Sequence, residues 1–337
     1  MPLRDVIGHR RIVALLARSI AHDSLPPSLI FAGPSGVGKR LSALAVAQTL
    51  NCQKKQSTAD LEIDGCGTCP SCVRIARGTH PDVLIIEPND KGNIQVDQVR
   101  EAIDRAAYRP FEGKCRVVII NEADALMPQA QNALLKTLEE PGSASVFILV
   151  TAHPDVLLPT VRSRCPRLSF RPLSPQDITA ALVKRGQKEA DALVVAATAD
   201  GSLGTALAAS AGDLAAAREI AQHVLAQAAK TAEPGRRIEV AKELLAKTGA
   251  GGAGDREQLS SHLRAMASLL RDIELLSTRA DTRALANPDV QPALERLSEA
   301  YRGERGVRAF TAVDQALGAL ERYAGVKVVA DWLVLQL

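Results

Sequence analysis

Strand-length apolar runs alternate with helix-period segments through the first half of the chain, and this alternation limits the fold more than any other feature. The runs predicted to be buried strands are Ser28–Ala32, Val83–Glu87, Arg116–Ile120 and Val146–Thr151. The segments predicted to be helices are Leu41–Leu50, Val96–Tyr108 and Pro128–Glu140. A repeated strand–helix order requires crossovers that pack onto the faces of a sheet. We therefore predict an α/β domain with a parallel sheet.

After Phe170 the strand pattern disappears, and Ala, Leu, Glu and Arg at helical spacing dominate the rest of the chain. Ser174, with Asp177 three residues later, predicts a capped helix that runs to about Arg185. Helix breaks are predicted at Asp200-Gly201-Ser202, Glu233-Pro234-Gly235 and Gly249–Gly254. The second half of the chain is therefore expected to be all-α.

An apolar stripe recurs at steps of three or four residues in the second half. It consists of Leu259, Leu263, Met266, Leu270, Ile273 and Leu276. Such spacing marks one face of a helix. We expect this face to be buried within a helical bundle, and a groove for a partner helix is the alternative.

Composition excludes several classes of protein. The length of 337 residues favours two or three domains, and a content of 46% hydrophobic and 23% charged residues excludes wholesale disorder. A net charge of +3 is too small for a DNA-coating polycation, and 3% aromatic residues argue against base-stacking platforms. No apolar run reaches about 18 residues, and the first residues lack the apolar core of a signal peptide. We expect a cytoplasmic protein that does not contact membranes.

A glycine-rich loop lies between the first predicted strand and the first predicted helix. It consists of Gly33, Pro34, Ser35, Gly36, Val37, Gly38 and Lys39. This is where a phosphate-binding P-loop points its backbone N–H groups at the phosphates of a nucleotide. The glycines let the backbone approach closely, and Lys39 adds a point charge toward the β- and γ-phosphates. The loop therefore indicates a nucleotide site.

Two positions depart from the pattern that retains Mg²⁺ at such a loop. Arg40 stands where the hydroxyl of a Ser or Thr would hold the metal. Asn121, after the third predicted strand, stands where an Asp would supply negative charge, although the adjacent Glu122 could still orient a water. The loss of two ligands for the same Mg²⁺ ion predicts inefficient ATP hydrolysis at this site. Lys39 still permits weak binding of ATP or ADP.

Four of the six cysteines are clustered, and they are Cys52, Cys66, Cys69 and Cys72. Four thiolates are enough for a closed tetrahedral zinc site without an open position for catalysis, so we predict structural zinc. Asp64-Gly65 and Gly67-Thr68 are expected to form turns whose N–H groups face the sulfurs. A redox pair is the weaker alternative. Cys115 is expected to be a packed thiol, and Cys165 has no His placed by the sequence to activate it.

Further segments complete the pattern, namely Val6-Ile7-Gly8-His9, Thr79-His80-Pro81-Asp82, Asn132-Ala133-Leu134-Leu135-Lys136-Thr137-Leu138-Glu139-Glu140-Pro141 and Ser163-Arg164-Cys165. With the P-loop and the cysteine module, they resemble bacterial clamp-loader subunits of the AAA+ class over nearly the whole chain. The last hundred residues match least well. The resemblance implies an AAA+ P-loop domain over 1–170 with a zinc module at 52–72, a helical lid over 171–212 and a helical collar over 213–337.

The resemblance also assigns roles to single residues. Arg164 by itself would be a solvated surface charge, but the resemblance implies an arginine finger for the ATP site of an adjacent gamma/tau subunit. Thr151 approximately matches the first sensor of the family, and a strand-end Thr without such a role is an equal alternative. The ATP-hydrolysing gamma/tau members carry a lid Arg where this chain has Gly204. The departures at Arg40, Asn121 and Gly204 resemble the delta-prime type of subunit.

The implied partners are gamma/tau and delta subunits of a five-membered ring, a sliding clamp reached indirectly, and primed-template DNA contacted through the complex. One alternative is an active gamma/tau-type ATPase motor, in which Glu122 and water complete the metal shell. Another is a sequence-reading zinc DNA binder that uses Arg162, Arg164 and Arg167. That alternative predicts His ligands or a basic recognition helix beside the cysteine module, and the module has neither.

Overall fold

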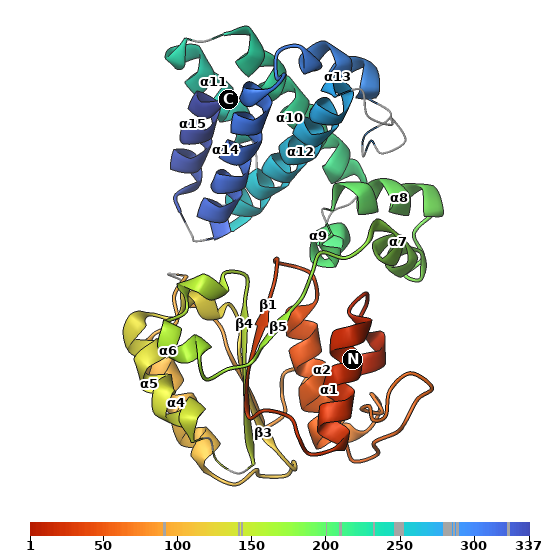
Figure 1. The fold of residues 1–337 in the computed structure, drawn as a ribbon, viewed down its shortest axis with the longest axis vertical. Coiled ribbons are helices and arrows are strands. Elements are labelled where there is room, and N and C mark those ends of the chain that lie inside the picture. The colour runs from red at the N-terminus through yellow and green to blue at the C-terminus, as the bar shows by residue number, and fades with distance from the viewer. Residues whose placement is uncertain are drawn as a thin grey trace. The chain divides into compact units, whose positions relative to one another are not determined.

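The computed structural model describes residues 1–89, 92–140, 142, 144–199, 201–208, 211–231, 233–245, 253–278, 285, 287, 290–321 and 324–337. The chain forms two compact units, Met1–Asp177 and Ile178–Leu337. The first unit contains the sheet, and the second unit consists of helices (Figure 1). The boundaries expected for a lid at 171–212 and a collar at 213–337 stay predictions.

A five-stranded parallel sheet forms the centre of the first unit. Its strands are β1 (Ser28–Ala32), β2 (Val83–Ile86), β3 (Arg116–Ile120), β4 (Ser145–Thr151) and β5 (Arg167–Ser169). They lie in the order β2-β3-β4-β1-β5, and every neighbouring pair is parallel. The predicted parallel sheet is confirmed, and four strands end within one residue of their predicted bounds. The sequence does not predict β5, because this edge strand exposes Arg167 and Ser169 and has no apolar run.

Helices cover both faces of this sheet. The helices that lie within the first unit are α1 (Arg10–Ala21), α2 (Lys39–Asn51), α3 (Pro70–Ala76), α4 (Val96–Ala107), α5 (Pro128–Glu139) and α6 (Pro159–Arg162), with 3₁₀ turns η1 (Leu3–Asp5), η2 (Ala123–Ala125) and η3 (Pro154–Val156). Leu29 and Phe31 of β1 pack with α1 and α2, whereas Ile30 and Ala32 pack with α4 and α5. Successive strand residues point to opposite faces, so β1 is apolar throughout. Figure 1 shows the two helical layers on opposite sides of the strands.

The second unit is built from helices alone within its described residues. They are α7 (Pro175–Val183), which begins at the end of the first unit, α8 (Glu189–Thr198), α9 (Leu203–Ala208), α10 (Ala211–Lys230), α11 (Pro234–Leu244), α12 (Ala253–Ser277), α13 (Gln291–Ser298), α14 (Glu304–Glu321) and α15 (Val326–Gln336). The predicted stripe of α12 is buried in the core of this bundle, with Leu276 partly buried. The expectation of burial is therefore confirmed. Across the described residues, no helix has the length and apolarity needed to cross a membrane.

Helix ends agree with most of the predicted signals. The N–H of Asp177 donates to Oγ of Ser174 at 3.1 Å, which confirms the cap of α7, although this helix ends at Val183 rather than near Arg185. The helix α11 begins at Pro234, as the break there predicts. Residues 200 and 249–252 of the other predicted breaks lie outside the described residues, and Gly254 lies within α12.

A buried carboxylate, Asp82, fixes the loop that precedes β3. Its oxygens accept backbone N–H groups from Phe111, Glu112 and Gly113 at 2.7–2.9 Å. The guanidinium of Arg116 donates to the same carboxylate at 2.9 Å. Burial alone would raise the pKa of Asp82, but these donors hold that pKa below its usual value. Asp82 is therefore an anchor whose charge contributes to stability.

We expect Asp82→Ala to lower the free energy of unfolding of the first unit by about 3–5 kcal/mol, because it leaves the buried guanidinium of Arg116 without its carboxylate. Urea denaturation followed by circular dichroism measures this change. Since the folded-state pKa is depressed, the contribution is fully present above the unfolded pKa of about 4 and is lost as pH falls through the folded pKa. The exposed Asp60→Ala is the control, with an expected change below about 0.5 kcal/mol. Equal losses in both variants would contradict the anchoring role.

Candidate functional site

The glycine-rich loop connects β1 to α2 at the edge of the sheet where the parallel strands end (Figure 1). Gly36 and Gly38 have φ angles of 74° and 105°, in the left-handed region that favours glycine. A Cβ at Gly33 would lie 2.1 Å from the carbonyl oxygen of Phe170, so a side chain does not fit there. The N–H of Gly33 donates to the carbonyl of Thr151 at 3.2 Å. The loop is thus held against the ends of β4 and β5.

The lysine of the loop is folded into the loop itself. Nζ of Lys39 donates to the carbonyl oxygens of Gly33 and Pro34 at 2.6 and 2.7 Å, and the residue is buried. Nε2 of His9 donates to the carbonyl of Val37 at 2.9 Å, since a carbonyl can only accept. Burial lowers the pKa of His9, so the ring is neutral near pH 7. These bonds set the shape of the loop before any phosphate arrives.

The two positions that depart from the magnesium pattern lie at the same edge of the sheet. Nη2 of Arg40 lies 2.8 Å from Oε1 of Glu87, which follows β2, and both side chains are about half exposed. The N–H of Asn121 donates to the carbonyl of Ile86 at 2.9 Å, so the residues that follow β2 and β3 are neighbours. A guanidinium therefore stands where the motif has a metal ligand, and it is paired with a carboxylate beside Asn121.

The strand-end Thr151 is bound to a residue that the sequence analysis missed. Its Oγ1 donates to Oδ1 of Asp124 at 2.6 Å, and the N–H of Ala152 donates to the same oxygen at 3.3 Å. Asp124 lies in η2, two residues after Glu122, which is exposed and has a φ of 51°. Asp124 and Thr151 are 27 positions apart, so no local sequence pattern identified this contact. The hydroxyl of Thr151 therefore links the ends of these two strands.

Arg164 is held by a carboxylate of α5. Its Nε donates to Oε1 of Glu139 at 2.6 Å, its Nη2 contacts the same oxygen, and its Nη1 donates to the carbonyl of Thr160 at 2.7 Å. The side chain of Arg164 remains 32% exposed. Burial raises the pKa of the neighbouring Cys165 to about 11, so this thiol is not a ready nucleophile. The structure thus joins two segments that the sequence analysis singled out separately.

The four clustered cysteines come together, as their spacing predicts. The sulfurs of Cys52, Cys66, Cys69 and Cys72 all lie within 4.8 Å of one another. A tetrahedron with Zn–S bonds of about 2.3 Å has S–S edges of about 3.8 Å, and the sulfurs of Cys52 and Cys69 are 3.9 Å apart. The donor set therefore fits a metal such as zinc.

Backbone N–H groups point at these sulfurs, as expected of the predicted turns. Sγ of Cys52 accepts from the N–H of Cys66 at 3.2 Å, and Sγ of Cys66 accepts from the N–H groups of Thr68 and Cys69 at 3.4 and 3.2 Å. Burial opposes ionisation of Cys66, but these donors lower its pKa to about 6. Burial raises the pKa of Cys72. Such N–H donors orient metal-bound thiolates and stabilise their charge.

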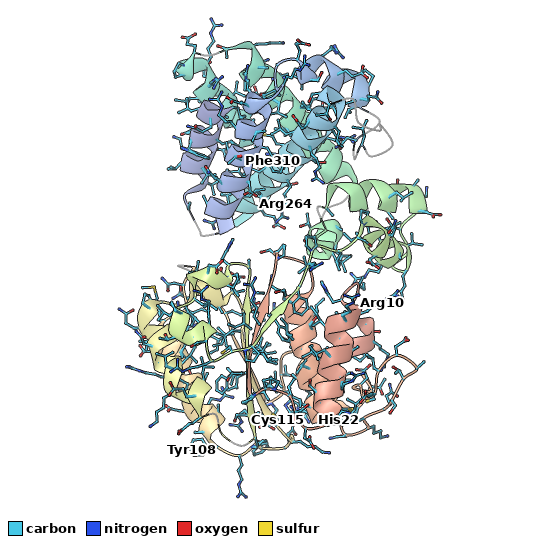
Figure 2. The ribbon with its side chains drawn as sticks, in the orientation of Figure 1. Arg10, His22, Tyr108, Cys115, Arg264 and Phe310 are labelled. Carbon is cyan, nitrogen blue, oxygen red and sulfur yellow. The ribbon has the colours of Figure 1, made fainter. Side chains whose placement is uncertain are left out.

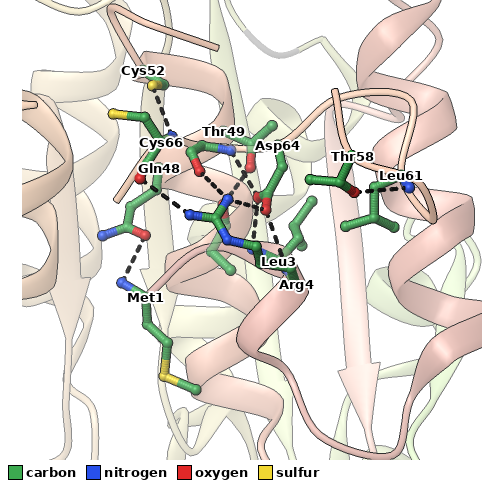
Figure 3. A network of polar contacts seen from close by, with 12 residues as sticks. Met1, Leu3, Arg4, Gln48, Thr49, Cys52, Thr58, Leu61, Asp64 and Cys66 are labelled. Atoms are coloured by element: carbon green, nitrogen blue, oxygen red, sulfur yellow. Dashed lines mark hydrogen bonds and ion pairs between the residues drawn. The ribbon is translucent and has the colours of Figure 1, made fainter. Parts of the chain in front are cut away.

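A buried carboxylate connects the cysteine cluster to the beginning of the chain (Figure 3). Oδ1 of Asp64 accepts the N–H groups of Leu3 and Gly65 at 2.8 and 2.7 Å. Nη1 of Arg4 donates to Oδ2 of Asp64 at 2.8 Å, and its Nη2 donates to the carbonyl of Cys66 at 3.2 Å. The sequence analysis treated Asp64 as a turn residue and did not identify this link between two segments.

Cys115 takes no part in the cluster. It precedes β3, at the edge of the sheet opposite the P-loop, where Figure 2 labels it near His22. Burial raises the pKa of Cys115 to about 11, and the thiol donates to the carbonyl of Arg116 at 3.6 Å. These features agree with the expected packed thiol.

A family model described as "DNA polymerase III, delta subunit" matches residues 8–174. The gamma/tau subunit of DNA polymerase III from Mycobacterium tuberculosis (strain ATCC 25618 / H37Rv) is 34% identical over 185 residues, which are 55% of this chain and 31% of that protein. The delta' subunit from Pseudomonas aeruginosa is 40% identical over 134 residues, which are 40% and 39% of the two chains. The delta' subunit from Bacillus subtilis is 34% identical over 175 residues, which are 52% and 51%.

The first half of this chain, residues 8–174, matches the DNA polymerase III clamp-loader family. The chain spans about a third to a half of the length of these curated relatives. Among solved structures, a gamma subunit-related protein from Thermotoga maritima aligns with a TM-score of 0.41 and 17% identity, covering 95% of this chain and 96% of that one. RuvB from the same organism aligns with a TM-score of 0.40 and 14% identity, covering 96% and 81%.

The clamp-loader match covers the P-loop, the cysteine cluster and Arg164, and it ends before Gly204. Relatives named gamma/tau and relatives named delta' both match this chain. The comparisons therefore show the family and do not distinguish between these two kinds of subunit.

Proposed function

We propose that this chain is a delta-prime-type subunit of the DNA polymerase III clamp loader, which helps to load the sliding clamp onto primed DNA. In this proposal it completes the ATP site of an adjacent gamma/tau subunit and hydrolyses little ATP itself. The observation that carries the proposal is the ion pair of Arg40 with Glu87 at the magnesium position of its own P-loop. A guanidinium and a neutral Asn121 at this position disfavour a divalent cation, and metal-assisted phosphoryl transfer requires one.

The trans role belongs to Arg164 in this proposal. Its guanidinium is partly exposed beyond the short helix α6, and its partner is the half-exposed Glu139 rather than a buried anchor. An arginine presented in this way can exchange a carboxylate for the γ-phosphate of a neighbour's ATP. Burial of Cys165 beneath it keeps the loop in place.

The proposed partners are gamma/tau and delta subunits, with the sliding clamp and primed-template DNA reached through the assembly. The cysteine cluster carries structural zinc in this proposal, because four sulfurs leave no open position for chemistry. The helices 171–212 act as a lid and the helices 213–337 as a collar that contacts other subunits.

An active gamma/tau-type motor is the second candidate. The 34% identity over 185 residues to a gamma/tau subunit favours it, since that stretch is longer than the match to the Pseudomonas delta' subunit. In that case Glu122 and water would complete the shell of the metal. The two candidates differ in which residue of this chain limits ATP turnover.

The deciding experiment compares ATP turnover by the reconstituted loader, with clamp and primed DNA, for Arg164→Ala and Lys39→Ala of this chain. A delta-prime-type subunit requires Arg164 and tolerates the loss of Lys39. A motor subunit shows the reverse pattern, and that result would withdraw the proposal.

A further inference from the structure

The residues at the magnesium position of this P-loop do not fit magnesium. They supply the guanidinium of Arg40, the carboxamide of Asn121 and the carboxylate of Glu87, which is already paired with Arg40 at 2.8 Å. A guanidinium has only donors and repels a divalent cation. Mg²⁺ binds through carboxylates, water and phosphate oxygens. The site nevertheless keeps a glycine-rich loop whose shape and lysine are suited to a phosphate.

The charges of these residues suggest what replaces the metal. Relative to the intact motif, Arg40 adds one positive charge and Asn121 removes one negative charge. The two changes together make the site more positive by two charges, which is the charge of the divalent cation that it does not fit. A polyphosphate still requires this compensation, because its oxygens lie close to one another in a partly buried loop.

We propose that this P-loop binds a nucleoside di- or triphosphate without a divalent cation, with the guanidinium of Arg40 in place of Mg²⁺. This inference rests on the proposed function, in which this subunit hydrolyses little ATP itself. An arginine side chain stays charged at any physiological pH and offers paired N–H groups to phosphate oxygens. The bound nucleotide is then held by the subunit and is not hydrolysed.

The existing contacts allow this exchange. Arg40 and Glu87 are each 49% exposed, and ion pairs so open to water contribute little to stability. If a phosphate replaces the Glu87 carboxylate as the partner of Arg40, the protein therefore loses little stability. Lys39 already lies inside the loop, where Nζ donates to the carbonyl oxygens of Gly33 and Pro34. Two cations thus flank the loop without any metal.

The test measures binding of fluorescent ADP and ATP to the full chain in excess EDTA and in excess MgCl₂. We expect the wild type to bind equally well or more tightly in EDTA. Arg40→Ser should weaken binding in EDTA by about 10-fold or more, since a charge-assisted hydrogen bond is lost. Arg18→Ala is the matched control, because it removes the same charge from the far end of α1 and should leave both affinities unchanged.

A second variant tests the inference through a gain of magnesium-dependent binding rather than through a loss of affinity alone. Arg40→Ser combined with Asn121→Asp restores both metal-binding positions. We expect this double variant to bind nucleotide poorly in EDTA and to recover affinity when Mg²⁺ is added. Circular dichroism of each variant shows whether it is folded.

Two results would overturn the inference, namely a wild type that requires Mg²⁺ to bind and a wild type that binds nucleotide under neither condition. Neither result touches the proposed function, which is measured as turnover in the assembled loader through Arg164. Conversely, unchanged ATP turnover in a loader that carries Arg164→Ala would refute the proposed function, even if the isolated chain bound nucleotide in EDTA.

Discussion

ATP turnover at the site beside this subunit is expected to fall by about 10³-fold or more when Arg164 is replaced by alanine, because an arginine finger stabilises charge on the transferring phosphoryl group. The measurement is single-turnover hydrolysis by a loader in which the adjacent motor subunit is the sole one able to hydrolyse ATP. Clamp and primed DNA are present throughout. Gel filtration of each variant loader shows that the assembly is intact.

The size of this effect can be compared with the cost of releasing Arg164 from Glu139. Their ion pair is 32% and 46% exposed on its two sides, and such surface pairs contribute about 0–1 kcal/mol. A rate factor of about 10³ corresponds to about 4 kcal/mol of transition-state stabilisation. Arg164 can therefore leave Glu139 for the transferring phosphoryl group with a net gain in free energy. The ion pair with Glu139 does not prevent the trans contact.

Two control substitutions separate the finger from a general loss of charge. Arg162→Ala removes an exposed arginine two residues away, whose partner is Asp155 at 2.7 Å, and should leave turnover unchanged. Arg164→Lys keeps the charge but loses the planar fork of donors, so turnover should stay low. If Arg162→Ala and Arg164→Ala slow the reaction equally, the effect is electrostatic steering and the finger is refuted.

The architecture of the first unit could be predicted because apolar strand runs and helical periodicity are both local patterns in the sequence. Three of the four predicted strands, β1, β3 and β4, are buried along their whole length, so burial and β-propensity agree there. The three predicted helices, which became α2, α4 and α5, end within two residues of their predicted bounds. The edge strand β5 differs, since water contacts Arg167 and Ser169 and no apolar pattern remains.

The contacts of the site depend on tertiary proximity, which no local pattern encodes. Glu139 and Arg164 are 25 positions apart, and Asp124 reaches Thr151 across 27 positions. Asp64 bonds to Leu3 across 61 positions. Spacing could predict the cysteine cluster because two of its three gaps are short and clustered thiolates favour a shared metal. A carboxylate has many possible partners, so its position in sequence does not identify one.

Removal of zinc is the second large effect that we expect. Cys72→Ser should reduce the bound metal from about one zinc per chain to none, since a closed site needs all four thiolates. Structural zinc in small folded units contributes about 10–16 kcal/mol of apparent binding free energy, which is comparable to the whole stability of a domain. The segment 52–72 should therefore unfold locally. Metal analysis and amide hydrogen exchange of the full chain measure the two consequences.

The hydrogen bonds of Asp64 define how far this unfolding spreads. Asp64 is buried within the module and accepts the N–H of Leu3, so the first turn of the chain loses its anchor when the module unfolds. The strand β3 has its own apolar packing on both faces and should keep its protection. Cys115→Ser, a half-buried thiol outside the cluster, should retain zinc and protection at 52–72. Wild-type chain without zinc, or unchanged exchange at 52–72 in Cys72→Ser, would contradict a metal-dependent module. Loss of protection in β3 as well would mean that zinc stabilises the whole first unit.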